Sequence, residues 1–313
     1  MEKEYVIGVD LGGTTVKIGL FRTNGKLLHK YEILTRTEKG GGFILKDIGD
    51  SIEATLMDMQ IPKEAVSGIG MGVPGAVKRD NYVAPCVNLE GWGGFNVADT
   101  FSVRMGIPVK VGNDANVAAL GEMWQGGGMG CRNLLFVTLG TGVGGGVVID
   151  GNLVTGTHGA AGEIGHIKVK PDETECCGCG KRGCLEQYAS APGIVNSAVK
   201  MLALGGKTSL RHCDELTCEA VFNHAKTGDE AAKQLLEDWG RVFGMALATV
   251  SCVYDPEIIV IGGGVSKAGK VVTDLAEKYF KEFAFPAAER TAFALASLGN
   301  DAGIYGAAKL AMG

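Results

Sequence analysis

A pattern of three short apolar runs separated by two turns occurs twice in this chain, near residues 5–34 and 133–155. In each copy a glycine-containing polar turn joins the first two runs, and an Asn-Gly or Asp-Gly pair precedes the third. Such pairs between apolar runs are strong hairpin signals. We therefore expect each copy to form three antiparallel strands, and the repeat indicates an internal duplication of two related halves.

Helices and further strands alternate through the rest of the chain, which predicts an α/β fold. Apolar periodicity predicts helices near residues 43–59, 191–204, 229–253, 267–283 and 302–312. Apolar runs predict additional strands near residues 66–73, 107–111 and 258–261.

The overall charge and the apolar runs exclude some classes of protein. The chain has 30 basic and 35 acidic residues, a net charge of -5, and no basic cluster, which argues against nucleic acid as a partner. No apolar run reaches the ~18 residues of a membrane span, so no membrane partner is expected. The nine cysteines, without an export signal, predict a reducing compartment, the cytoplasm, where clustered cysteines bind metal before they form disulfides.

The first polar turn has the composition of a phosphate-binding turn. Backbone amides freed by glycine and threonine hydroxyls bind phosphate, and an aspartate at the strand end is able to hold Mg²⁺. An ordinary hairpin turn is the alternative. The candidate residues are Asp10, Gly12, Gly13, Thr14, Thr15 and Lys17.

Two later glycine turns are candidates for nucleotide contacts. The turn expected at residues 140–146 matches G-x-G-x-x-G, but a strand follows it, whereas a dinucleotide-binding fingerprint opens a helix. A Walker A loop is also excluded, because Met201 stands where the motif needs glycine. The turn at Gly263 and Gly264 follows a strand and is able to let an adenosine lie flat against its backbone, with a tight strand-to-helix turn as the alternative.

Asn113 and Asp114 follow the strand expected at residues 107–111. Loops at strand ends commonly carry catalytic groups in α/β proteins, and an aspartate there is suited to accept a hydroxyl proton. Both residues are also common helix caps. The sequence leaves both roles open.

A segment rich in cysteine predicts a zinc site. Cys177, Cys179 and Cys184, with His166 upstream, supply enough ligands for a closed tetrahedral site. Cys176 is able to replace a neighbour. Since all four ligands come from the protein, we expect Zn²⁺ to be structural and to fix His166, Glu163 and Glu186 around one pocket.

These segments together resemble the ROK family of sugar kinases and regulators, within the actin-like, ribonuclease-H-like superfamily. The resemblance rests on DLGGTTVKIG at 10–19, VPG at 73–75, NDAN at 113–116, LGTGVGGG at 139–146, GAAGEIGH at 159–166, CGCGKRGCLEQYAS at 177–190 and IGGGVS at 261–266.

The resemblance implies a fold of two α/β lobes around a cleft, residues 1–118 with 300–313 and residues 119–299. It implies ATP-dependent transfer of phosphate to the 6-hydroxyl of a hexose, with Asp114 as the catalytic base. The sugar-binding residues that it implies are Asn113, Glu163, His166, Glu186, Gly75 and Asn88. It also implies that Thr14 and the turn of Gly140, Thr141 and Gly142 face the ATP phosphates, and that Gly263 and Gly264 face the adenosine. The cofactors and assembly that it implies are ATP, Mg²⁺, structural Zn²⁺ and a homodimer or dimer of dimers.

Glucose is the expected substrate, because residues 185–195 look most like the bacterial glucokinases of the family. The alternatives are kinases for N-acetylglucosamine, N-acetylmannosamine, mannose, fructose or allose. A sugar-responsive regulator is a more distant alternative, since it needs a helix-turn-helix segment and the phosphate motif here already begins at Asp10.

Overall fold

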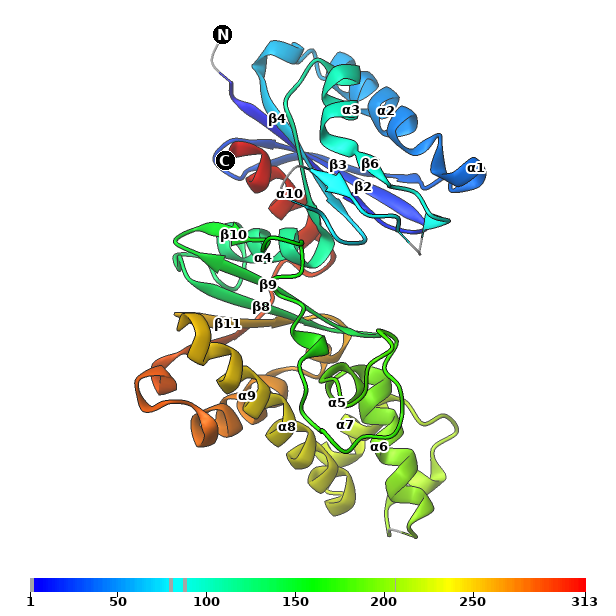
Figure 1. The fold of residues 1–313 in the computed structure, drawn as a ribbon, viewed down its shortest axis with the longest axis vertical. Helices are drawn as coiled ribbons and strands as arrows, with labels where there is room; N and C mark the ends of the chain where they lie inside the picture. Colours follow the sequence, from blue (N-terminus) through cyan, green and yellow to red (C-terminus); the bar gives the residue numbers. More distant parts are fainter. Residues whose placement is uncertain (1–2, 79–80, 87–88, 206) are drawn as a thin grey trace. The chain divides into compact units, whose positions relative to one another are not determined.

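The computed structural model describes residues 3–78, 81–86, 89–205 and 207–313 (Figure 1). The chain forms two compact units. Unit 1 comprises Met1–Arg132, Gly146–Gly162 and Leu298–Gly313, and unit 2 comprises Asn133–Gly145 and Glu163–Ser297. The division expected at residue 118 falls inside a helix of unit 1, Asp114–Gln125, so that helix belongs whole to the unit that carries the N-terminus.

The first sheet has the strand order β3-β2-β1-β4-β7 in the described residues. Its strands are β1 (Tyr5–Leu11), β2 (Thr15–Arg22), β3 (Leu27–Leu34), β4 (Val66–Val73) and β7 (Val109–Asn113). Strands β1, β2 and β3 pair antiparallel, whereas β4 is parallel to both β1 and β7. A separate short hairpin, β5 (Tyr82–Val83) with β6 (Phe95–Asn96), was not predicted from the sequence.

Alternate residues of β1 face two different layers. Ile7, Val9 and Leu11 belong to a core that includes the apolar stripe of α2 (Ile44–Asp58). Val6, on the other face, packs against Ile304 of the C-terminal helix α10 (Ala302–Met312). The remaining helices of unit 1 are α1 (Glu38–Gly41), α3 (Val97–Met105) and α4 (Asp114–Gln125).

Glycines on β1 and β4 let α10 approach the sheet closely. A Cβ on Gly8 would overlap the carbonyl oxygen of Ile304, and a Cβ on Gly70 would overlap that of Ala307. Side chains cannot occupy these positions without moving the helix. The close approach brings the start of α10 beside the end of β1, where Asp10 lies.

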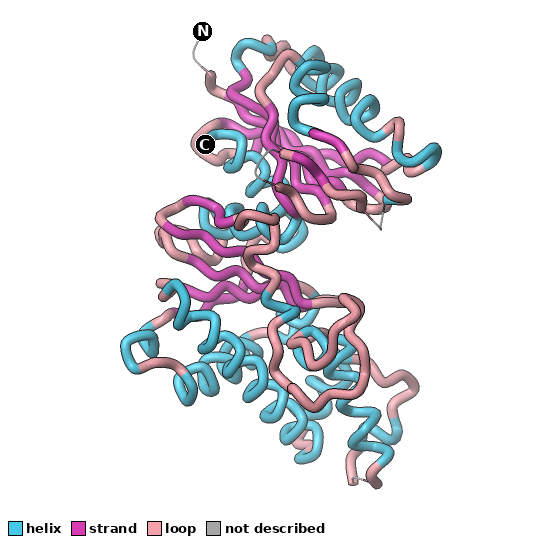
Figure 2. The backbone as a smooth tube through the Cα atoms, viewed as in Figure 1, coloured by secondary structure: helices cyan, strands magenta, loops and turns pink. Residues whose placement is uncertain are grey.

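The second sheet has the order β10-β9-β8-β11-β12 in the described residues (Figure 2). Its strands are β8 (Leu134–Leu139), β9 (Val143–Ile149), β10 (Asn152–Val154), β11 (Ile258–Gly262) and β12 (Ala292–Leu295). The associated helices are α5 (Glu186–Ala189), α6 (Ala191–Ala203), α7 (Cys218–Lys226), α8 (Glu230–Tyr254) and α9 (Lys270–Phe283).

Both sheets follow one plan. In each, the first strand of the sequence repeat is central, the hairpin strands lie on one side, and two later parallel strands lie on the other. The duplication inferred from the turn pattern and the α/β fold class are confirmed. The expected glycine turn at 140–146 is shorter than predicted, because residues 144–146 continue β9.

No helix in the described parts of the chain has both the length and the apolar character needed to cross a membrane.

Candidate active site

The turn between β1 and β2 is tightly closed and leaves two residues exposed. Gly12 donates its backbone N–H to the Thr15 carbonyl oxygen at 3.0 Å. Thr35 donates its hydroxyl to the Gly12 carbonyl oxygen at 2.7 Å. Gly13 and Thr14 remain exposed at the tip. Amides and hydroxyls on an anchored turn are well placed to bind phosphate.

Asp10 lies in a crowded, charged environment at the end of β1. A Cβ on Gly303 would lie 2.5 Å from the Asp10 carboxyl carbon, so glycine is required beside it. Burial raises the pKa of Asp10 to about 6; Lys17 opposes this effect and Asp114 adds to it. Because a buried carboxylate beside a second carboxylate gains from a bound cation, and Mg²⁺ prefers oxygen ligands, these residues fit a magnesium ion.

The sequence left open whether Asn113 or Asp114 caps the helix that follows, and the structure gives the cap of α4 to Asn113. Asn113 is the N-cap, since its Oδ1 accepts from the backbone N–H of Asn116 at 3.2 Å. Its amide also donates to the Gly75 carbonyl oxygen at 3.1 Å. Asp114 is the first residue of α4, and its side chain remains exposed while its Oδ1 accepts from the backbone N–H of Ala115 at 2.8 Å. Asn113 therefore caps the helix and leaves the Asp114 carboxylate accessible.

The surroundings of Asp114 favour a proton acceptor. Protein atoms packed around the carboxyl group raise the pKa of Asp114 above its usual value, although hydrogen bonds partly oppose this effect. Gly72 lies beside both aspartates, since a Cβ there would be 3.7 Å from Asp10 Oδ1 and 3.8 Å from the Asp114 Cα. A raised pKa strengthens a carboxylate as a base.

Gly75 adopts a backbone conformation that favours glycine, with φ of 124°. A Cβ there would lie 3.0 Å from the sulfur of Cys86, a buried residue that sequence reasoning did not select. Burial, and then Asp114, raise the pKa of the Cys86 thiol, so Cys86 stays neutral near the carboxylate. Asn88, the other less specific sugar candidate, lies outside the described residues.

The predicted zinc ligands converge in unit 2. Ligand atoms of His166, Cys177, Cys179 and Cys184 all lie within 4.8 Å of one another. The sulfurs of Cys179 and Cys184 are 3.7 Å apart, and Cys177 Sγ is 3.7 Å from His166 Nδ1. Zn–S bonds of about 2.3 Å in a tetrahedron place sulfurs about 3.8 Å apart, so the cluster has the dimensions of a zinc site. Within the described residues, the cluster uses Cys177 and leaves Cys176 out.

Glu186 connects the cysteine loop to the glycine turn that precedes β9. Its Oε2 accepts from the backbone N–H of Val143 at 3.0 Å, and its Oε1 lies 3.6 Å from the sulfur of Cys177. A Cβ on Gly142 would overlap the same carboxylate. The sequence assigned Glu186 to the sugar alone, whereas the structure shows that it also holds the turn.

Glu163 and His166 share one short turn, in which the backbone N–H of His166 donates to the Glu163 carbonyl oxygen at 3.1 Å. Gly165 packs against Val143, so this turn lies beside the start of β9. Glu163 and His166 are both exposed. Three of the predicted sugar-binding side chains, those of Glu163, His166 and Glu186, are thus gathered around the zinc-ligand cluster and the start of β9.

A pocket of about 470 Å³ opens beside the predicted adenosine turn. Gly264 lines it, as does Ala191, whose backbone N–H donates to the Gly140 carbonyl oxygen at 2.9 Å. Sequence reasoning found the glycine turns but missed the opposite wall. The missed residues, mostly from α7, are Thr217, Cys218, Glu219, Phe222, Asn223, Lys226 and Lys267.

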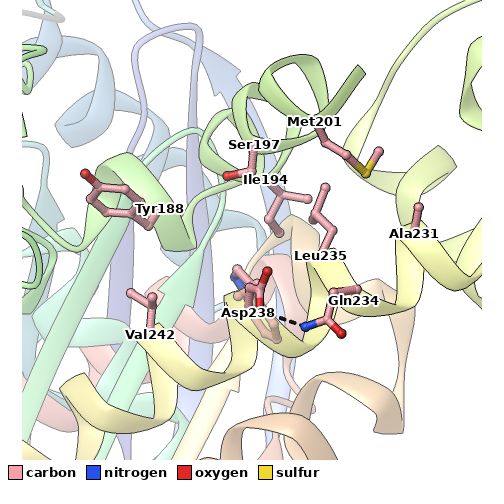
Figure 3. Close-up of a pocket in the computed structure, with 10 residues that line it drawn as sticks. Tyr188, Ile194, Ser197, Met201, Ala231, Gln234, Leu235, Asp238 and Val242 are labelled. Atoms are coloured by element: carbon pink, nitrogen blue, oxygen red, sulfur yellow. Dashed lines mark hydrogen bonds between the residues drawn. The ribbon is translucent and has the colours of Figure 1, made fainter. Parts of the chain in front are cut away.

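A second pocket, of about 380 Å³, lies among α5, α6 and α8 (Figure 3). Its wall is mainly apolar, with Ile194, Leu235 and Val242 facing it, and the Gln234 amide at its edge already donates to Asp238 at 2.9 Å. Neither glycine turn reaches this pocket. The pocket beside Gly264 is therefore the better candidate for a nucleotide.

Gly263 and Gly264 form a matched pair for testing the turn. Gly263 has φ of 84°, and a Cβ there would overlap the Leu139 carbonyl oxygen, whereas a Cβ on Gly264 would meet no atom within 4 Å. We expect Gly263→Ala to lower the free energy of unfolding by about 2 kcal/mol or more and Gly264→Ala to change it by less than about 1 kcal/mol. Urea denaturation of both variants measures this, and equal effects would contradict the assigned geometry.

Known proteins resemble this chain over nearly its whole length. The model of the ROK family matches residues 6–313. The glucokinase of Halalkalibacterium halodurans is 41% identical, over 98% of this chain and 94% of its own. That of Thermotoga maritima is 34% identical, over 99% of this chain and 98% of its own.

A solved structure gives the same result. The crystal structure of a ROK family glucokinase from Streptomyces griseus in complex with glucose and AMPPNP matches with a TM-score of 0.72 and 33% identity. The match covers 98% of each chain. With the duplicated sheets and the shared motifs, these similarities give one conclusion: this chain belongs to the ROK family.

Proposed function

We propose that this protein transfers the γ-phosphoryl group of ATP to the 6-hydroxyl of glucose. The observation that carries the proposal is the accessible Asp114 carboxylate, with its raised pKa, at the first residue of α4. Phosphoryl transfer to an alcohol needs a group that orients the hydroxyl and accepts its proton. Similarity to glucokinases over the whole chain supports ATP and a hexose as the substrates.

In unit 1, Asp114 accepts the proton of the attacking hydroxyl. The Asn113 side chain is held by its hydrogen bonds to Asn116 and Gly75, and in this fixed position it binds a sugar hydroxyl. The exposed amide of Gly13 and hydroxyl of Thr14 contact phosphate oxygens. Asp10 would hold Mg²⁺, which would supply neutralisation of the phosphate charge.

In unit 2, Glu163, His166 and Glu186 bind sugar hydroxyls. A carboxylate that pairs with one hydroxyl position is left unpaired by the wrong epimer, which gives selectivity. The turn from Gly140 to Gly142 contacts phosphates, and the pocket beside Gly264 takes the adenosine. His166, Cys177, Cys179 and Cys184 would hold Zn²⁺, which would make this loop rigid.

The sugar preference is tested by steady-state ADP release with Mg-ATP. We expect kcat/KM for glucose to exceed that for N-acetylglucosamine, N-acetylmannosamine, mannose, fructose and allose by at least about 10-fold. A higher value for any of these sugars would reassign the substrate within the same reaction. If no sugar in the panel, glucose included, led to ADP release, the proposed kinase activity would be contradicted.

The assembly and location follow the family expectation: a homodimer or dimer of dimers in the cytoplasm. Light scattering of the purified protein measures the assembly, and a monomer at working concentration would contradict it.

A further inference from the structure

A hydrogen-bonded chain of four side chains lies in unit 2, apart from every residue assigned above to sugar, phosphate or zinc. Cys213 Sγ lies 3.2 Å from His224 Nε2 on α7. The other ring nitrogen, Nδ1, lies 2.6 Å from Ser209 Oγ. Ser209 Oγ in turn donates to Asp229 Oδ2 at 2.6 Å.

The proton positions in this chain follow from its last member. Although burial alone would raise the pKa of Asp229, hydrogen bonds from Ser209 and Ala232 lower it well below its usual value, so Asp229 is an acceptor only. The single hydroxyl proton of Ser209 therefore points to Asp229. Ser209 Oγ then accepts a hydrogen bond from His224 Nδ1–H, and in the neutral imidazole this tautomer places the lone pair of Nε2 toward the Cys213 thiol.

This tautomer is the one that a general base for a thiol requires. A nucleophile, a histidine and a third group that fixes the histidine are the parts of nucleophilic triads. His224 Nε2, 3.2 Å from the sulfur, is the group placed to take the thiol proton. Cys213 is also partly exposed, which lets a reagent reach it.

A purely structural role explains only part of the arrangement. Asp229 caps α8 by accepting from the backbone N–H of Ala232 at 2.9 Å, and Thr208 and Ser209 fasten the preceding segment to it. None of these contacts needs a thiol at position 213. Fastening the segment therefore does not account for the position of Cys213 Sγ beside His224 Nε2.

We propose that Cys213 is an activated thiol that forms a mixed disulfide with a low-molecular-weight disulfide. His224 Nε2 takes the thiol proton, and Cys213 Sγ attacks one sulfur of the incoming disulfide. The incoming S–S bond breaks as the new one forms, and the released thiolate takes the proton from His224. Cys213 is oxidised, and the released half of the reagent is reduced to a thiol.

An adduct at Cys213 has a route to the nucleotide pocket. His224 is carried by α7, and the adjacent residue Asn223 lines the pocket beside Gly264 together with Phe222. An adduct on Cys213, which lies against His224, displaces α7 and so weakens nucleotide binding. This consequence, unlike the reactivity of the thiol, rests on the proposed function.

The experiment treats the metal-loaded full chain with oxidised glutathione and follows each cysteine by peptide mass spectrometry. Cys252, an exposed thiol on α8, is the internal control. We expect Cys213 to form the adduct at least tenfold faster than Cys252. His224→Asn keeps an amide donor toward Ser209 but removes the base, and it should slow Cys213 at least tenfold without changing Cys252.

Equal rates at Cys213 and Cys252, or a Cys213 rate unchanged in a folded His224→Asn protein, would overturn the proposal. A second measurement is the affinity for a non-hydrolysable ATP analogue before and after treatment, with Cys213→Ser as the control. Weaker binding only in the protein that retains Cys213 supports the link to the pocket. Fast modification with unchanged binding overturns that link and leaves the reactive thiol and the kinase standing.

Discussion

Replacing Asp114 with asparagine is expected to lower kcat by about 10²–10⁴-fold while the dissociation constant for glucose stays within about threefold. The amide keeps the volume of the carboxyl group but accepts no proton. The fold should persist, because Asn113 and not Asp114 provides the N-cap of α4. Burial raises the pKa of Asp114, so the folded protein disfavours its charge and tolerates a neutral side chain.

Asp99 offers a matched control for this prediction. It is an exposed acid in the first turn of α3, a helix that is likewise capped by an asparagine. Asp99→Asn should leave kcat unchanged. Turnover of Asp114→Asn within tenfold of the wild type, measured by ADP release and with glucose binding measured by calorimetry, would remove Asp114 from the role of base.

Loss of zinc is expected to weaken glucose binding by on the order of 10²-fold. Cys177 is one of the clustered ligands and its sulfur lies 3.6 Å from Glu186 Oε1, so the metal and the sugar-binding carboxylate share one support. Cys177→Ser should lose both the metal and the sugar affinity. The neighbouring Cys176→Ser should retain both, since Cys176 is exposed and outside the cluster.

Metal analysis and calorimetric titration with glucose on the same samples provide the test. Zinc-free protein that binds glucose with wild-type affinity would contradict the supporting role of the metal. Loss of zinc from Cys176→Ser and not from Cys177→Ser would reverse the assignment of these two ligands.

The cluster of candidate zinc ligands was predictable because three of its four residues lie close together in sequence. Cys177, Cys179 and Cys184 occupy a single loop, and the backbone N–H of Cys177 closes that loop on the Lys181 carbonyl oxygen at 2.7 Å. Local spacing therefore limited which sulfurs were able to meet. The choice between Cys176 and Cys177 needed the direction of each side chain, which spacing does not give.

The two roles at the start of α4 were not separable in the sequence, because capping and proton transfer use the same residue types. The structure settles the capping role alone, which the bond from Asn116 gives to Asn113. The second glycine turn is shorter than expected, because residues 143–145 already belong to β9. At Gly146, where the strand was expected to begin, a Cβ would lie 2.6 Å from that of Ala119 on α4, so the packing of α4 requires glycine there.

The wall of the pocket that we propose for the nucleotide carried no signal that sequence reasoning could use. Helix α7 is short and carries several polar residues, and its apolar residues Val221, Phe222 and Ala225 are too few to establish a period. Its contribution depends on the packing of α7 beside the turn at Gly264. Contacts of this kind are set by tertiary structure, whereas the turns themselves are set by glycine.

The most direct test of the central claim is ³¹P nuclear magnetic resonance of the products formed from Mg-ATP and glucose by the zinc-loaded protein. The account predicts that glucose 6-phosphate and ADP form in equal amounts. The Asp114→Asn variant should form both products much more slowly. Inorganic phosphate in place of the sugar phosphate, or phosphate on another hydroxyl, would contradict it.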